Sequence, residues 1–279
     1  MKKLNQIILV SLLTWMISGC SKEEIPYYDS ARDAVRFENN SRYGYDATTA
    51  TLYKSYSFCE APLDEYTIFS IPLGLVGNKT DKDRTVACVV DAELSTAPAN
   101  LYEILDATIP ADSLTGQVRV KIYNPTDEET YTLVLRLGTS PDLEAGPAAY
   151  LKASLSWNNT IPEPSNNNVV RTYNMLIKST LAFTSTSKAN YSPAALKLIV
   201  AAFGWNDWND PAAHPEYPYT ASYFLYPYLP DYRIVYAELT YASYAANLGK
   251  YIANYNLTHE PLRHDAGGLI GQPIEARTY

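Results

Sequence analysis

Two short stretches, QVRVKIY at residues 117–123 and YTLVLRL at residues 131–137, decide the fold class of this chain. In both, apolar residues recur at every second position. They are Val118, Val120 and Ile122 in the first stretch, and Leu133, Leu135 and Leu137 in the second. Because successive side chains of a strand point to opposite faces, this period of two predicts two β-strands, each with one buried face.

Segments of the same kind recur between residues 37 and 160. Two more strands are predicted at residues 66–73 (YTIFSIPL) and 85–90 (TVACVV), and turn-forming residues separate the runs. Many short strands joined by turns are typical of a β-sandwich. We therefore predict an immunoglobulin-like β-sandwich domain over residues 37–160.

The pattern changes after this domain. Residues 160–168, TIPEPSNNN, contain two prolines and a run of asparagines, which neither continue a strand ladder nor favour a helix start, so we predict a linker at 161–169. A C-terminal helical, aromatic-rich domain should follow at 170–279. The predicted fold is mainly β with a smaller α segment.

Two helices are expected in the C-terminal domain. Ser192 and Pro193 suit an N-cap and a first helical position, apolar residues follow at helical spacing, and Gly204 suits the end of that helix. A second helix is predicted from about Tyr232 to Tyr255, where apolar residues recur every three or four positions.

The first twenty residues have the pattern of a signal peptide. Lys2 and Lys3 precede an uncharged stretch at 7–16, which at about ten residues is half the length needed to span a bilayer. The sequence ISGC at 17–20 resembles the lipobox of bacterial lipoproteins, in which the cysteine is acylated and becomes the new N-terminus. We predict a signal peptide at 1–19, lipidation of Cys20 and a polar tether at 20–36.

The residues after Cys20 predict the membrane to which the protein is sent. They are Ser21, Lys22, Glu23 and Glu24, and they resemble the acidic export signal of Bacteroidetes surface lipoproteins. The resemblance implies an outer-membrane, lipid-anchored protein that faces the cell exterior. Outer-membrane lipid would be the partner of the acylated Cys20, and each buried CH₂ of the acyl chains would contribute about 0.8 kcal/mol to the anchor.

The net charge of the chain restricts the partners that it can bind. The chain has 22 basic and 30 acidic residues, and loss of Lys2 and Lys3 with the leader takes the net charge from −8 to −10. A surface of that sign repels phosphate, so nucleic acid is not an expected partner.

Cys59 and Cys88 are either joined in a disulfide or present as two buried free thiols.

No motif for catalysis or metal binding stands out. The chain lacks a Gly-x-Ser-x-Gly nucleophile elbow, a phosphate-binding glycine loop and a His-Glu-x-x-His sequence. The histidines His214, His259 and His264 show no metal-binding spacing, and the last two are expected in solvated loops. We predict no catalytic residue, no metal site and no cofactor.

Aromatic residues supply the candidate contact surface. Of 25 tyrosines, eleven lie between Tyr217 and Tyr255, after the sequence WNDW at 205–208. Tyrosine and tryptophan combine a flat apolar face with a polar edge, which suits a sugar, a peptide or a protein partner. The candidate residues are Trp205, Asn206, Asp207, Trp208, Tyr217, Tyr219 and Tyr223. The alternative is a cluster of rings that pack on one another.

Several of these segments together resemble a poorly characterised family of Bacteroidetes surface lipoproteins. They are the lipobox, the start CSKEE at 20–24, the strand IPL at 71–73 with its Asp83-Arg84 turn, and the segment at 191–199. The resemblance implies association with a TonB-dependent outer-membrane transporter and its lid lipoprotein. The expected function is that of a non-enzymatic accessory in nutrient uptake, which binds an oligosaccharide or peptide or docks on the transporter complex.

Two other functions remain open. A cell-surface hydrolase of glycan or peptide would need converging acidic groups or a metal in a cleft. An adhesin or fimbrial component would need an exposed strand edge for β-augmentation.

Overall fold

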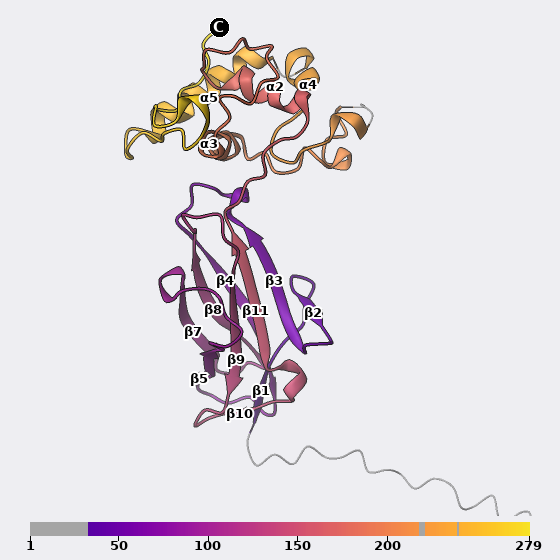
Figure 1. The fold of residues 1–279 in the computed structure, drawn as a ribbon. Coiled ribbons are helices and arrows are strands. Elements are labelled where there is room, and N and C mark those ends of the chain that lie inside the picture. Colours follow the sequence, from indigo (N-terminus) through magenta and orange to yellow (C-terminus); the bar gives the residue numbers. More distant parts are fainter. Residues whose placement is uncertain (1–32, 218–220, 239) are drawn as a thin grey trace, which may run out of the picture.

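The computed structural model describes residues 33–217, 221–238 and 240–279 of the chain. A strand region, from Ala34 to Asn158, is followed by a helical region that begins at Asn167 (Figure 1). The predicted signal peptide, the lipidation site Cys20 and the export signal at 21–24 lie outside the described residues. Strand β1 (Ala34–Phe37) begins inside the predicted tether, so the last three residues of that segment belong to a sheet.

The strand region contains two sheets. The six-stranded sheet has the order β10 (Glu144–Ala145), β1, β4 (Tyr66–Val76), β8 (Thr115–Tyr123), β7 (Tyr102–Ile109) and β5 (Arg84–Thr85). The five-stranded sheet has the order β2 (Gly44–Asp46), β3 (Thr51–Ser57), β11 (Lys152–Asn158), β9 (Tyr131–Gly138) and β6 (Ala87–Val90). The pairs β1–β10 and β3–β11 are parallel, and the other pairs within these sheets are antiparallel.

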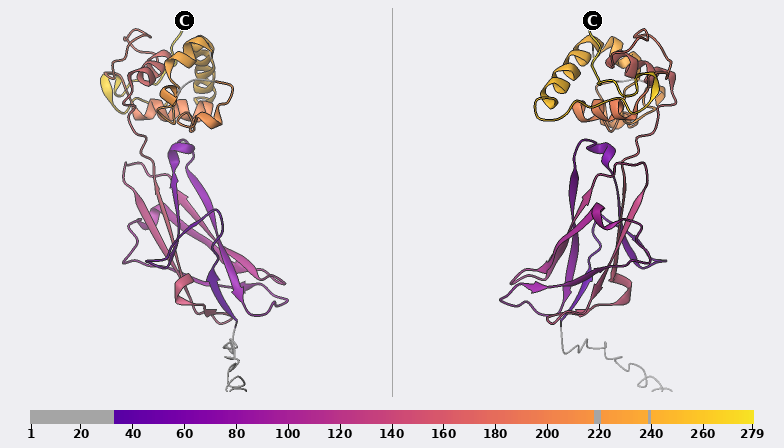
Figure 2. Two further views of the ribbon diagram at one scale, coloured as in Figure 1. Left: turned by 90° about the vertical axis from the view of Figure 1, so that its right-hand side faces the viewer. Right: turned by 60° about the vertical axis from the view of Figure 1, so that its left-hand side comes forward.

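The two sheets pack face to face around one apolar core (Figure 2). Val118, Val120 and Ile122 of β8 are buried in it, as are Leu133, Leu135 and Leu137 of β9. The alternation in these two stretches therefore identified the inward faces of both sheets. The prediction of a mainly β chain with a two-sheet sandwich and C-terminal helices is confirmed.

The predicted strand at 85–90 is two strands in different sheets. Thr85 pairs with β7 in one sheet, whereas residues 87–90 pair with β9 in the other. Val86, between them, is buried and donates its amide hydrogen to the carbonyl of Ala107. The expectation of one continuous strand was wrong, because the apolar run spans a crossing between the two layers.

The described residues of the helical region include the α-helices α2 (Asn167–Leu176), α3 (Pro193–Phe203), α4 (Tyr232–Ala237) and α5 (Tyr241–Tyr255). Helix α3 has the predicted ends: the Ser192 side chain accepts a hydrogen bond from the Ala195 amide, and Gly204 ends the helix with φ 67°. Single-turn 3-10 helices complete the structure: η1 (Phe58–Glu60), η2 (Ala99–Leu101), η3 (Ala148–Tyr150), η4 (Pro211–Ala213), η5 (Ala221–Tyr223) and η6 (Gly267–Leu269).

Two helix predictions need correction. The asparagine run does start a helix, since the Asn166 side chain accepts a hydrogen bond from the Asn168 amide and α2 begins at Asn167. Asparagine is a favoured N-cap, and that preference outweighed its low helix propensity. The helix predicted from Tyr232 to Tyr255 is divided into α4 and α5, with Thr240 in the left-handed conformation at φ 55°.

The tip of the β3–β4 connection, η1, lies at the junction of the two regions. Phe58 is buried in the sandwich core, whereas Cys59 is buried in the apolar cluster of the helical region, against α3. The segment at 159–166, which connects β11 to α2, is bonded to both regions. The Thr160 hydroxyl donates to the Glu128 carbonyl, and the Tyr226 hydroxyl donates to the Pro162 carbonyl. Packed residues therefore connect the two regions. The division into domains at these boundaries stays a prediction.

The two cysteines of the described chain are free. Cys59 packs in the helical region and Cys88 against the sandwich core. Burial raises the pKa of both thiols, that of Cys88 to about 12.

We expect both thiols to resist alkylation in the folded protein, because the thiolate is the reactive form and burial disfavours it. Iodoacetamide labelling at mildly alkaline pH, read by mass spectrometry, should modify neither cysteine in buffer and both in concentrated guanidinium. Labelling of Cys59 at the same rate under both conditions would mean that the junction opens freely.

Candidate binding sites

The tryptophan pair predicted as a contact surface lies inside the helical region. Trp205 is 8% exposed and Trp208 is 4% exposed. Trp205 stacks on Phe203, with ring centroids 4.5 Å apart, and meets Trp208 edge to face at 6.1 Å. Both tryptophans belong to the buried apolar cluster of the helical region and leave little ring surface for a ligand.

His214 completes this stack of rings. Its imidazole lies parallel to Trp208 with a centroid distance of 3.9 Å. Its Nε2 is 3.1 Å from a carboxylate oxygen of Asp207, and its Nδ1 is 3.6 Å from one of Glu216. The polar residues of this segment thus hold the histidine against the aromatic stack.

The other residues of the predicted contact surface have different environments. Asn206 and Asp207 are exposed, Tyr217 and Tyr223 are partly buried, and Tyr219 lies outside the described residues. This arrangement favours the alternative in which the rings pack on one another. A contact role for the exposed side chains stays a prediction.

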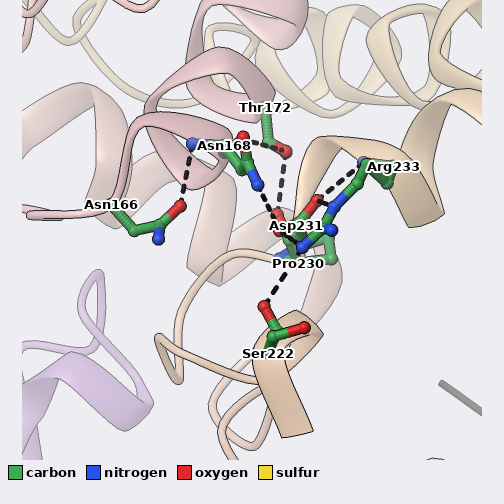
Figure 3. Close-up of polar contacts among 7 residues, drawn as sticks. All are labelled: Asn166, Asn168, Thr172, Ser222, Pro230, Asp231 and Arg233. Atoms are coloured by element: carbon green, nitrogen blue, oxygen red, sulfur yellow. Dashed lines mark hydrogen bonds and ion pairs between the residues drawn. The ribbon is translucent and has the colours of Figure 1, made fainter. Parts of the chain in front are cut away.

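Residues 205–230, which hold Trp205, Trp208 and the tyrosines after them, are called the aromatic segment. A buried carboxylate, Asp231, follows its C-terminal end (Figure 3). Asp231 is 1% exposed and accepts hydrogen bonds from Nε and Nη2 of Arg233, both at 2.8 Å, and from Nδ2 of Asn168 at 3.1 Å. Arg233 also reaches the carbonyl of Ser222. Because its oxygens are occupied within the fold, Asp231 is a structural group that joins α2 to α4.

A different surface, on the outer face of the five-stranded sheet, has the form of a binding site. It is a groove of about 900 Å³. Its floor crosses three strands, because Tyr53 of β3 and Val134 of β9 both pair with Ser154 of β11. The described residues that line the groove are Tyr45, Asp46, Ala47, Thr48, Thr49, Thr51, Tyr53, Leu94, Val134, Lys152 and Ser154.

One wall of this sheet groove is the turn after β2. Asp46 accepts hydrogen bonds from the Thr49 hydroxyl and the Thr48 amide, both at 2.8 Å, and these bonds lower the pKa of its carboxyl. The ring of Tyr45 stacks on Tyr150, and its hydroxyl donates to the Ala149 carbonyl at 2.9 Å. Side-chain contacts therefore hold the wall in place.

The opposite wall carries Leu94, which is half exposed. The segment on which it lies is bonded to β9: the Asp91 amide donates to the Val134 carbonyl at 2.8 Å. Asp91 also accepts a hydrogen bond from the Leu94 amide. Both sides of the groove are thus built on a paired sheet, the kind of support that keeps a site in shape.

Tyr53 supplies an aromatic surface to the floor. It is 49% exposed, and it faces Gly44 of the edge strand β2 across the sheet. A Cβ at Gly44 would lie 2.3 Å from Cζ of Tyr53, so the ring rests directly on the glycine backbone. A tyrosine over an edge glycine also stabilises a sheet, and here it leaves one ring face open to solvent.

The histidines outside the stack need one correction. His264 is 3% exposed, not solvated, and burial lowers its pKa. Its backbone closes the loop around η6, since the His264 amide donates to the Gln272 carbonyl and the Gly271 amide donates to the His264 carbonyl.

The described residues form a further hollow. A hollow of about 730 Å³, mostly apolar, lies between α5 and residues 273–279. Within the described ranges, no three histidine, cysteine or acidic side chains are grouped to hold a metal ion, and no helix is both long and apolar enough to cross a membrane.

Sequence comparison identifies the family. Residues 28–174, which cover the strand region and most of α2, match the family described as "Domain of unknown function (DUF4843)", and the chain belongs to that family. No curated protein matches the sequence.

Comparison with solved structures finds only partial similarity. A candidate carbohydrate-binding protein from Bacteroides ovatus is 11% identical, with a TM-score of 0.33, over 46% of this chain and 37% of that chain. A two-domain protein of unknown function from Bacteroides fragilis is 12% identical, with a TM-score of 0.33, over 47% of this chain and 46% of that chain. The chain spans less than half the length of either structure.

Proposed function

We propose that this protein is a non-enzymatic binding protein that holds an oligomeric nutrient, glycan or peptide, at the outer surface of the cell. The sheet groove is the observation that carries the proposal. Its volume of about 900 Å³ lies in the range of ligand-binding clefts. It also combines a fixed, half-exposed aromatic ring at Tyr53 with hydroxyl and charged groups.

The chemistry of the groove favours binding over hydrolysis. Glycoside hydrolysis generally uses two carboxyl groups that face each other across the bond to be cleaved. Among the described residues that line the groove, Asp46 is the one carboxylate, and its oxygens already accept turn hydrogen bonds.

Strand addition, as in an adhesin, has weaker support. The edge strands of the two sheets are β2, β6, β5 and β10, and each has two to four residues. Short edges of this kind offer few backbone groups to a second chain.

The proposal includes display through an acylated Cys20. Strand β1, the first described strand of the chain, lies at the lower end of the strand region, and the helical region lies at the opposite end (Figure 1). An anchor before residue 33 would therefore leave the helical region farthest from the membrane. That end would be available to a TonB-dependent transporter and its lid lipoprotein, the partners in our proposal.

The test has two parts. The mature protein is screened on glycan and peptide arrays, and each bound oligomer is then examined by mass spectrometry for cleavage. We expect an intact bound oligomer. A cleaved oligomer would make the protein a hydrolase, and an absence of binding to any member of either array would contradict the binding function.

Display is tested in cells. Palmitate labelling should mark the parent protein and not a Cys20→Ala variant, and affinity purification from solubilised outer membranes should recover the transporter and lid. An unlabelled parent protein would contradict the anchor, and a protein recovered alone would contradict the accessory role.

A further inference from the structure

We infer that the sheet groove is a glycan site for an acidic sugar, in which a pyranose ring lies on Tyr53 and its carboxylate meets Lys152. This inference rests on the proposed binding function and narrows the ligand to one chemical class, glycans with uronic acid units. It is carried by the fixed aromatic face, by the hydroxyl groups around it and by the ammonium group beside it.

The aromatic face is pre-positioned. The ring of Tyr53 rests on Gly44, where a Cβ would lie only 2.3 Å from its Cζ, and yet 49% of the residue is exposed. A pyranose has a face of axial C–H bonds that is flat and apolar, as is the open face of the ring. Little side-chain freedom remains to be lost when a sugar stacks on it.

The groups around the ring suit a sugar better than a peptide. A peptide that binds by strand addition needs unpaired backbone donors and acceptors, but the floor strands β3, β11 and β9 are hydrogen-bonded to one another. What the floor presents is side chains, among them the hydroxyls of Thr51 and Ser154.

The hydroxyls of the turn are set to accept hydrogen bonds. Thr49 donates its hydroxyl hydrogen to Asp46, and Thr51 donates its own to the Thr49 carbonyl, so the lone pairs of these hydroxyls are available. Each carboxylate oxygen of Asp46 can also accept a second bond. Sugar hydroxyls, which donate hydrogens freely, fit such a set of acceptors.

Lys152 gives the groove its selectivity for acid. It is partly buried at the start of β11, and no carboxylate of the described chain lies within ion-pair distance of its ammonium group. Its register neighbour Arg136 is already paired with Asp91. Lys152 is therefore the one cation lining the groove, in a chain whose net charge is −8.

The spacing fits a uronic acid. Lys152 lies two residues before Ser154 on the same face, and thus about 7 Å along the strand from the row that contains Tyr53. A carboxylate on the sugar ring and the four-carbon side chain of lysine together span this distance. A sugar stacked on Tyr53 can then place its carboxylate at Nζ.

The test compares the same glycans with and without their charge. Oligomers from pectin, alginate and hyaluronan, all carboxylated pyranosides, are titrated into the mature protein by calorimetry, each beside its methyl ester. We expect at least one acid to bind about fivefold more tightly than its ester, with the difference reduced by salt. Lys152→Gln should remove the difference.

Three variants test the aromatic face. Tyr53→Ala should weaken acid and ester alike by about tenfold. Gly44→Ala should act in the same direction, because the new Cβ displaces the ring without removing any side chain from the groove. Tyr66→Ala, a tyrosine of similar exposure (45%) on the other sheet, is the matched control and should change nothing. Circular dichroism confirms that each variant is folded.

The outcomes separate this inference from the proposed function. Equal binding of acids and esters would overturn the role of Lys152, and unchanged binding by Tyr53→Ala and Gly44→Ala would overturn the groove as the site. Failure of all three acids while other glycans or peptides bind would overturn the ligand class and leave the binding function standing. Failure of every oligomer on the arrays would contradict the binding function itself.

Discussion

Replacing Trp208 with alanine is expected to lower the free energy of unfolding by about 3–5 kcal/mol. The indole is 4% exposed, is stacked on His214 and lies edge to face with Trp205. Its backbone amide also donates to the Pro227 carbonyl. Truncation would leave a cavity in the cluster that holds the aromatic segment, and guanidinium unfolding followed by far-ultraviolet circular dichroism measures the loss.

Asn206→Ala is the matched control, because Asn206 lies between the two tryptophans in sequence and its side chain is exposed. A change within about 0.5 kcal/mol is expected there. If Trp208→Ala kept the stability of the parent and lost a ligand or partner, the tryptophan would be a contact residue after all.

The tryptophan pair shows why composition alone left this question open. The sequence WNDW has the same rings whether they face solvent or pack inward, and the partners that bury them, Phe203 and His214, lie on both sides of it in sequence. The spacing of apolar residues before Gly204 was enough to predict helix α3 from the sequence. Residues 211–217 fold back so that His214 and Tyr217 pack on Trp208, and the spacing of apolar residues in the sequence cannot predict such tertiary contacts.

Local signals were sufficient where one residue determines the local structure. Ser192 and Gly204 define the ends of α3 by capping chemistry, and alternation in β8 and β9 identifies the buried faces. The asparagine run was misread because the same residue that disfavours a helix interior favours its N-cap, and which of the two applies depends on the next turn.

The sheet groove could not have been found from the sequence. Its floor joins residues 53, 134 and 154 through a parallel pairing of β3 with β11 and an antiparallel pairing of β11 with β9. Each strand alone shows only that an outward-facing side chain is present. The one local signal was Gly44 in a short polar strand, since a glycine within a strand often marks close approach by another group.

Replacing Asp231 with alanine is expected to cost about 3 kcal/mol of stability, at the lower end of the range for breaking a buried ion pair. The carboxylate is 1% exposed, binds Asn168 of α2 and Arg233 of α4, and caps α4 by accepting a hydrogen bond from the Arg233 amide (Figure 3). The Arg233 side chain is 33% exposed, so water can solvate the charge left behind and limit the loss. Hydrogen exchange should become faster in residues 221–237, which the network holds.

Glu275→Ala is the comparison that isolates burial. Glu275 pairs with Lys178 at 2.5 Å, but both side chains are more than half exposed, and loss of such a pair should cost less than about 1 kcal/mol. Asp231→Asn should fall between the two, because its amide oxygen can still cap α4. If both alanine variants lost the same stability, burial would not explain the strength of the Asp231 network, and its hold on the aromatic segment would have to come from ring packing alone.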